Sequence, residues 1–110
     1  MMEIYDMDDY QRLAKRTKEP TATLDYLVHG LASEAGEVAG VRKRMIRDDG
    51  DELTVTRRAE MLSELGDCLW YVAMLADRLD TNLSEVASTN IAKLFDRKAR
   101  GVIRGKGGNR

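Results

Sequence analysis

Two pairs of carboxylates limit what this chain can fold into. Glu34 and Glu37 stand three residues apart in the stretch EAGE, and Glu64 and Asp67 do the same in ELGD. Both stretches lie within apolar patterns of helical period, and residues three apart share one face of a helix. Two helices that faced each other through these acids would enclose divalent cations. The pattern therefore predicts a helical protein with two long helices paired at the acids.

The rest of the chain favours an all-α fold. It has a single proline and few aromatic residues, and it is rich in residues that favour helices. Apolar periodicity and capping residues predict four helices, and a length of 110 residues suits one domain. We expect helices at about 7–18, 22–47, 55–80 and 83–100, forming one domain over 1–100 that resembles a four-helix bundle, and a basic glycine-rich tail over 101–110.

Composition excludes several classes of protein. One cysteine and one histidine are too few for a disulfide framework or a Cys/His zinc site. The N-terminus is acidic where a signal peptide would be basic. The longest apolar run, 68–76, has nine residues, far fewer than the roughly 20 of a membrane helix. We therefore expect a cytoplasmic protein with no membrane partner.

Apolar faces predict how the helices pack. The helix at 55–80 is apolar on nearly every side between 68 and 76, which favours a second subunit around it. Trp70 and Met74 are expected on its far side, and Trp70 fits either a core or interface position or a platform for a base. In the last helix, the residues expected to face the core include Leu83, Val86, Ile91 and Phe95.

Charge is distributed unevenly along the chain. Residues 1–89 carry 11 Lys and Arg against 18 Asp and Glu, whereas residues 90–110 carry seven against one. A basic segment beside an acidic body suits a phosphate-bearing ligand. The candidate phosphate contacts are Asn90, Lys93 and Arg97 on one helix face, and Arg104, Lys106 and Arg110 in the tail. Nucleic acid is disfavoured because the basic segment has one aromatic residue, Phe95, which is expected in the core.

The four acids need positive charge nearby, since clustered carboxylates repel one another. Oxygen ligands select hard cations, so Mg²⁺ is the natural occupant and Mn²⁺ an alternative. A di-iron site is disfavoured because no Glu-x-x-His pair accompanies the acids. The glycines Gly36 and Gly66 suggest that a metal, a phosphate or a helix comes close there. The competing interpretation is a salt-bridge network with the basic residues Arg42, Lys43, Arg44, Arg57 and Arg58.

With these motifs the chain resembles the MazG-like all-α nucleoside triphosphate pyrophosphohydrolases, a superfamily with the dimeric dUTPases and dCTP pyrophosphatases. Its E-x-x-E and E-x-x-D motifs match the two acid pairs, separated here by 26 residues. Its N-x-x-K-x-x-x-R pattern matches Asn90, Lys93 and Arg97, and the likeness covers about residues 8–110. The resemblance implies hydrolysis between the α- and β-phosphates, with two or more Mg²⁺ ions at the four acids, in dimers or tetramers.

For several residues, the sequence leaves two interpretations open. Many family members carry a glutamate where this chain has Ser33, so the resemblance leaves Glu34 or Glu60 to activate water. His29 fits a core or helix contact or a contact to the nucleotide, and Tyr71, on the acid edge of its helix, is a further substrate candidate. The rival function for the whole chain is a non-catalytic helical dimerisation module whose acids are neutralised by arginines.

Overall fold

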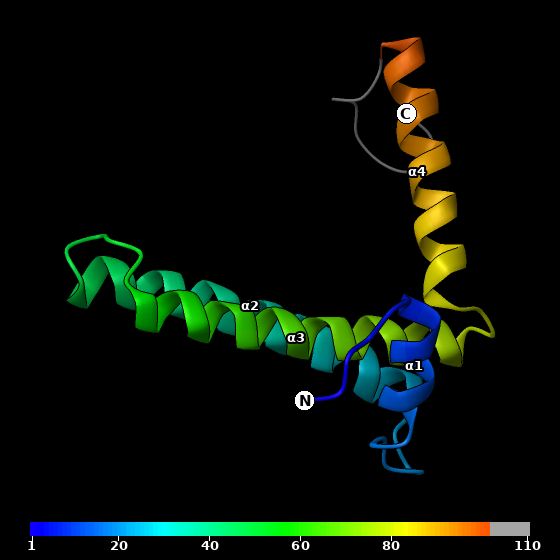
Figure 1. Ribbon diagram of the computed structural model, residues 1–110, viewed down its shortest axis with the longest axis horizontal. Helices are drawn as coiled ribbons and strands as arrows, with labels where there is room; N and C mark the ends of the chain where they lie inside the picture. Colours follow the sequence, from blue (N-terminus) through cyan, green and yellow to red (C-terminus); the bar gives the residue numbers. More distant parts are fainter. Residues whose placement is uncertain (102–110) are drawn as a thin grey trace.

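The computed structural model describes residues 1–101 and confirms an all-α fold (Figure 1). Arg104, Lys106 and Arg110 lie outside the described residues. The described chain forms four helices, α1 (Met7–Lys15), α2 (Leu24–Asp48), α3 (Val55–Arg78) and α4 (Leu83–Arg100). No helix of this part of the chain is both long and apolar enough to cross a membrane.

Local side-chain chemistry explains where the helices begin. Asp6, Thr23, Thr54 and Asn82 each accept a hydrogen bond from the backbone N–H three residues further on. Such bonds satisfy N–H groups that have no partner within the helix. The helix ends are similarly local, since Gly101 closes α4 with a left-handed φ of 73°.

Two helices end earlier than the periodicity predicts. α1 ends at Lys15, and a turn follows in which the Thr17 hydroxyl donates to the carbonyl of Ala14 at 2.7 Å. α3 ends at Arg78, and Asp80 then has a left-handed φ of 61°. Serine, threonine and aspartate compete in this way with helical hydrogen bonds near helix ends.

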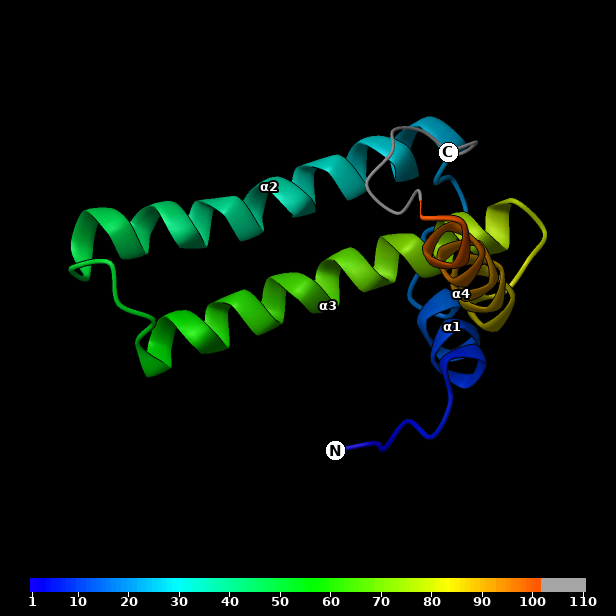
Figure 2. The ribbon, with the colours of Figure 1, turned by 90° about the horizontal axis from the view of Figure 1, so that it is seen from above.

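A long antiparallel hairpin of α2 and α3 dominates the molecule, and α1 packs across α3 near its C-terminal end (Figure 2). The core lies at this end of the hairpin, and Met74, expected on the far side of α3, is 1% exposed within it. Its burial fits the expectation that the stretch 68–76 is surrounded, and on this side of α3 the covering elements are α1 and the start of α2 of the same chain. The buried residues of this core cluster are Ala14, Leu27, Ala73, Met74, Ala76 and Leu83. Val41 and Met45 are buried further along α2.

The last helix leaves the hairpin. α4 rises steeply from the end of α3 (Figure 1), and among the described residues it packs on α1 and α3 without touching α2. Leu83 is buried as expected, but Val86 and Ile91 are exposed and Phe95 is 69% exposed. The expectation of a core position was wrong for these three residues, because no element of the described chain lies over that face of α4.

Buried hydrogen bonds of Gln11 join α1 to the start of α4. The Gln11 amide donates to the carbonyls of Ala73 at 3.1 Å and Thr81 at 3.2 Å, and its Oε1 accepts from the Leu83 N–H at 3.2 Å. The side chain is 7% exposed, so water does not readily replace these partners. Gln11 therefore holds the α3–α4 turn in position against α1.

We expect Gln11→Ala to lower the free energy of unfolding by roughly 2–3 kcal/mol, since it leaves buried polar groups without partners. Urea unfolding of the purified protein measures this loss. Ser84→Ala is the matched control, because it removes an exposed hydroxyl bond to Asp8 at the same helix start and is expected to cost less than about 1 kcal/mol. Equal losses in the two variants would show that Gln11 has no special role at this junction.

Candidate functional site

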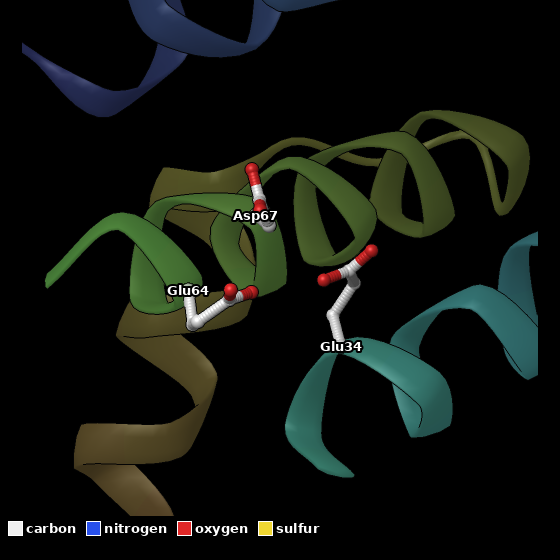
Figure 3. Close-up of side chains that lie close together, drawn as sticks. All are labelled: Glu34, Glu64 and Asp67. Carbon is white, nitrogen blue, oxygen red and sulfur yellow. The ribbon is translucent and has the colours of Figure 1, made fainter. Parts of the chain in front are cut away.

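Three of the four motif acids, one on α2 and two on α3, lie close together between these helices. Glu34 and Glu64 are half-buried and Asp67 is exposed, and one carboxylate oxygen of each lies within 4.8 Å of the others. Figure 3 shows Glu64 reaching from α3 towards Glu34 on α2, with Asp67 one turn further along α3. The antiparallel pairing of two helices therefore brings together acids that are about 30 residues apart in sequence.

Like charges crowd this cluster. The pKa of Glu64 is raised, first by burial and then by the negative charges of Asp67, Glu34 and Glu37, together with a hydrogen bond in which the protonated Glu64 donates to Glu34. Two carboxylates can share a hydrogen bond only when one of them holds a proton. Glu37 thus acts on the same site, although its oxygens are not among the three that lie closest together.

The nearby basic residues form ion pairs elsewhere. Arg57 pairs with Asp49 at 2.6 Å and with Glu60 at 3.0 Å, Arg44 approaches Glu60, and Arg42 pairs with Asp51. Among the described residues, no ion pair includes a motif acid. The arginines therefore neutralise the hairpin loop and Glu60, and the salt-bridge interpretation of the motif acids loses its basis.

The donor set fits a hard divalent cation. All donors at the cluster are carboxylate oxygens, and they come from two helices that hold them in place. Oxygen-only sites suit Mg²⁺, Mn²⁺ or Ca²⁺. Bound positive charge would also relieve the repulsion that raises the pKa of Glu64.

Tyr71 lies beside the acids because α2 has a glycine opposite it. A Cβ atom at Gly30 would lie 2.1 Å from a ring carbon of Tyr71, so the ring rests directly on the backbone of α2. The pKa of Tyr71 is raised, first by a hydrogen bond with Tyr26 and then by burial and the charges of Tyr26, Glu34 and Asp67. Tyr71 thus borders the acid site, as its place on the acid edge of the helix suggests.

Sequence reasoning missed two tyrosines near the site. The Tyr26 and Tyr71 rings are 6.4 Å apart between centroids, and the pKa of Tyr10 on α1 is raised by burial and by the charge of Asp67. Nothing in the local sequence marks either residue, because each reaches the site through the packing of its helix on α3. Three tyrosines therefore lie near the acids, Tyr10 and Tyr71 within reach of their charges and Tyr26 against Tyr71.

The glycines next to the motif acids have a different environment. A Cβ atom added at Gly36 or Gly66 would meet nothing within 4 Å in the described part of the chain. The expectation that a helix comes close there is not met within one chain. The glycine with a steric requirement is Gly30, which the sequence analysis did not identify.

The other candidate substrate residues are more dispersed. His29 is exposed, and its Nδ1 lies 2.8 Å from the Asp25 carbonyl of its own helix, so it is not a core residue. Asn90 and Lys93 line a shallow depression along α4, and none of the three clustered acids lines it. Arg97 is buried near the end of α4. Within one chain, Asn90 and Lys93 therefore line a different site from the three acids.

A helical hairpin with opposed carboxylates defines an all-α protein with an acidic cluster between two helices. The chain belongs to the MazG nucleotide pyrophosphohydrolase domain family, whose model matches residues 22–102. It is also similar to the Gene 37 protein of Mycobacterium phage L5, with 48% identity over 87 residues that cover 79% of this chain and 76% of that protein. No solved structure shows a significant match. The resemblance seen in the motifs is thereby confirmed.

Proposed function

We propose that the protein hydrolyses (deoxy)nucleoside triphosphates between the α- and β-phosphates in a reaction that requires Mg²⁺ or Mn²⁺. The observation that carries this proposal is the carboxylate cluster of Glu34, Glu64 and Asp67, which no basic residue of the described chain neutralises. Membership of a nucleotide pyrophosphohydrolase family supports it. In this proposal Glu34, Glu37, Glu64 and Asp67 are the metal ligands and the catalytic residues.

In the proposed reaction, water attacks a phosphorus atom and the anhydride bond between the α- and β-phosphates breaks. The products are a nucleoside monophosphate and pyrophosphate, and the proton from water passes to a carboxylate. Glu34 suits this role better than Glu60, because Glu60 is already paired with Arg57 and Arg44. The chemistry that bound Mg²⁺ supplies there is neutralisation of charge on the phosphate oxygens.

Basic and polar groups would hold the phosphates and the nucleoside. We assign phosphate contacts to Asn90, Lys93 and Arg97 and to the tail residues Arg104, Lys106 and Arg110, and nucleoside contacts to His29 and Tyr71. Lysine binds phosphate as a point charge, and arginine binds it through a two-pronged fork. Since Asn90 and Lys93 do not line the acid site of their own chain, they would reach it from a second copy.

That second copy also accounts for exposed apolar residues. Val86, Ile91 and Phe95 of α4 and Leu62 and Leu65 of α3 are exposed in one chain. Burial of such residues is the main favourable term in association. We propose a dimer, or a pair of dimers, and light scattering coupled to size-exclusion chromatography measures the mass in solution.

The reaction is tested by incubating the protein with a panel of dNTPs and NTPs, with and without Mg²⁺. We expect monophosphate and pyrophosphate in equal amounts, and no products when EDTA removes the metal. Mg²⁺ at about 100 times its Kd should also stabilise the fold by roughly 2.7 kcal/mol, seen as a higher Tm. Stepwise release of single phosphates would contradict the reaction. A Tm insensitive to Mg²⁺ would instead support a non-catalytic dimerisation module.

A further inference from the structure

A cavity lies between the loop that joins α1 to α2 and the hairpin helices α2 and α3. It has a volume of about 280 Å³ and is lined by Thr17, Glu19, Thr21, Ala22, Tyr26 and Trp70. Trp70 follows Asp67 by three residues, which is about 4.5 Å along the axis of α3. Tyr26 precedes Glu34 by eight residues, about 12 Å along α2. In space, Tyr71 links the cavity to the acids: its ring centroid lies 6.4 Å from that of Tyr26 and 4.9 Å from that of Trp70, and the charges of Glu34 and Asp67 act on its hydroxyl. A nucleotide with its phosphates at the acids could therefore place its base in the cavity.

The main aromatic wall of this cavity is held in place. The Trp70 indole N–H donates to the Thr17 hydroxyl at 2.8 Å, and that hydroxyl donates in turn to the carbonyl of Ala14 at 2.7 Å. The Trp70 ring also packs edge-on against Tyr71, with centroids 4.9 Å apart and an interplanar angle of 82°. Tyr71 in turn is held against Gly30. A ring fixed from both sides is preorganised to stack against a flat ligand.

The polar groups of the cavity favour one kind of base. The Thr17 hydroxyl is used by Trp70 and Ala14, and the Tyr26 hydroxyl is hydrogen-bonded with Tyr71. Glu19 and Thr21 are therefore the lining side chains available for hydrogen bonds with a ligand. An ionised carboxylate can only accept hydrogen bonds. It therefore matches the exocyclic amine of cytosine, adenine or guanine, whereas the carbonyl of uracil or thymine at the same place would repel it.

We propose that this cavity binds the base of the nucleotide, stacked on Trp70, and that Glu19 selects bases with an exocyclic amine. The proposal rests on the proposed function, because the acid site would hold the phosphates of the same molecule. It adds a specificity-determining residue that no acid motif contains. From the sequence, Trp70 fitted either a core or interface position or a platform for a base. The proposal gives it the second role.

The test uses the fluorescence of Trp70, the single tryptophan of the chain. The probes are dCMP and dUMP, which differ at the position where cytosine carries an amine and uracil a carbonyl. We expect dCMP to quench the Trp70 fluorescence of the full-length protein at concentrations about tenfold lower than dUMP does. This difference corresponds to one charge-assisted hydrogen bond, which dCMP makes and dUMP cannot. Quenching by both at equal concentrations would overturn the base preference, and no quenching by either would overturn the cavity as the base site.

Glu19→Gln separates the role of the carboxylate from that of the ring. Glutamine keeps the size of the side chain and can also donate to the uracil carbonyl, so the preference for dCMP should fall to within about twofold. Glu52→Gln, the same change at an exposed residue of the α2–α3 loop, is the control that should keep the tenfold preference. A preference that persists in Glu19→Gln would overturn the assignment of Glu19.

Hydrolysis assays distinguish this proposal from the proposed function. Turnover of dCTP by a protein whose fluorescence does not respond to dCMP would overturn the base cavity alone. Quenching by dCMP in a protein that hydrolyses no triphosphate would overturn the proposed reaction and leave the cavity as a nucleotide-binding site.

Discussion

Glu64→Gln is expected to lower kcat/KM for nucleotide hydrolysis by roughly 10²- to 10³-fold, the usual loss when one group that stabilises the transition state is removed. Glutamine keeps the shape of the side chain but removes a charged ligand from the cluster with Glu34 and Asp67. Steady-state assays of pyrophosphate release across Mg²⁺ concentrations measure the effect. If lost metal affinity is the main cause, high Mg²⁺ should restore part of the activity.

Stability measurements separate this loss from misfolding. The pKa of Glu64 is raised in the folded protein, by burial and by the neighbouring acids, so its charged form is disfavoured there. Without metal at neutral pH, the neutral glutamine should therefore leave Tm unchanged or higher. Glu52→Gln, in the exposed hairpin loop, should change neither activity nor Tm. Full activity in Glu64→Gln would contradict the role of the cluster.

Gly30→Ala is expected to destabilise the fold by roughly 1–3 kcal/mol, the usual cost of forcing an extra methyl group into a packed site. The new Cβ atom would lie 2.1 and 2.4 Å from two ring carbons of Tyr71, so the ring or the helices must move. Tyr71 borders both the acids and Trp70, and its displacement should reduce hydrolysis as well. Chemical unfolding and the pyrophosphate assay measure the two effects.

The control for Gly30→Ala is the same change one turn beyond the acid site. At Gly40 a Cβ atom would meet only the end of the flexible Arg44 side chain, at 3.5 Å, so Gly40→Ala should gain up to about 1 kcal/mol of helix propensity. Combining Gly30→Ala with Tyr71→Ala should cost less than the sum of the single changes, because the clash is then absent. Equal stability of Gly30→Ala and Gly40→Ala would show that the Tyr71 ring does not rest on Gly30.

Much of the fold could be predicted because its signals are local. The caps at Asp6 and Asn82 and the stop at Gly101 depend on a few neighbouring residues, and they lie where the sequence indicates. The acid pairs were recognisable for the same reason, since helical period alone places Glu64 and Asp67 on one face. Their meeting with Glu34 required only that two long helices form an antiparallel hairpin.

Packing between helices was harder to predict. The apolar period marks Phe95 as a core residue, yet Phe95 is exposed, whereas Met74, on the side of α3 away from its main apolar face, is buried. Periodicity identifies a face of a helix but not what covers it. Here α1 covers Met74 and no described element covers Phe95, which is why the apolar face of α4 favours a second copy.

Around the acids, too, some features follow from local sequence and others only from the packing of helices. The helices, their caps and the identity of the acids follow from spacing and propensity, which act over one or two turns of chain. The position of Tyr71 on Gly30, the hydrogen bond from Trp70 to Thr17 and the cavity beside Glu19 join residues of different elements. Such contacts depend on the distance and relative rotation of packed helices, which many side chains set together and no local pattern records.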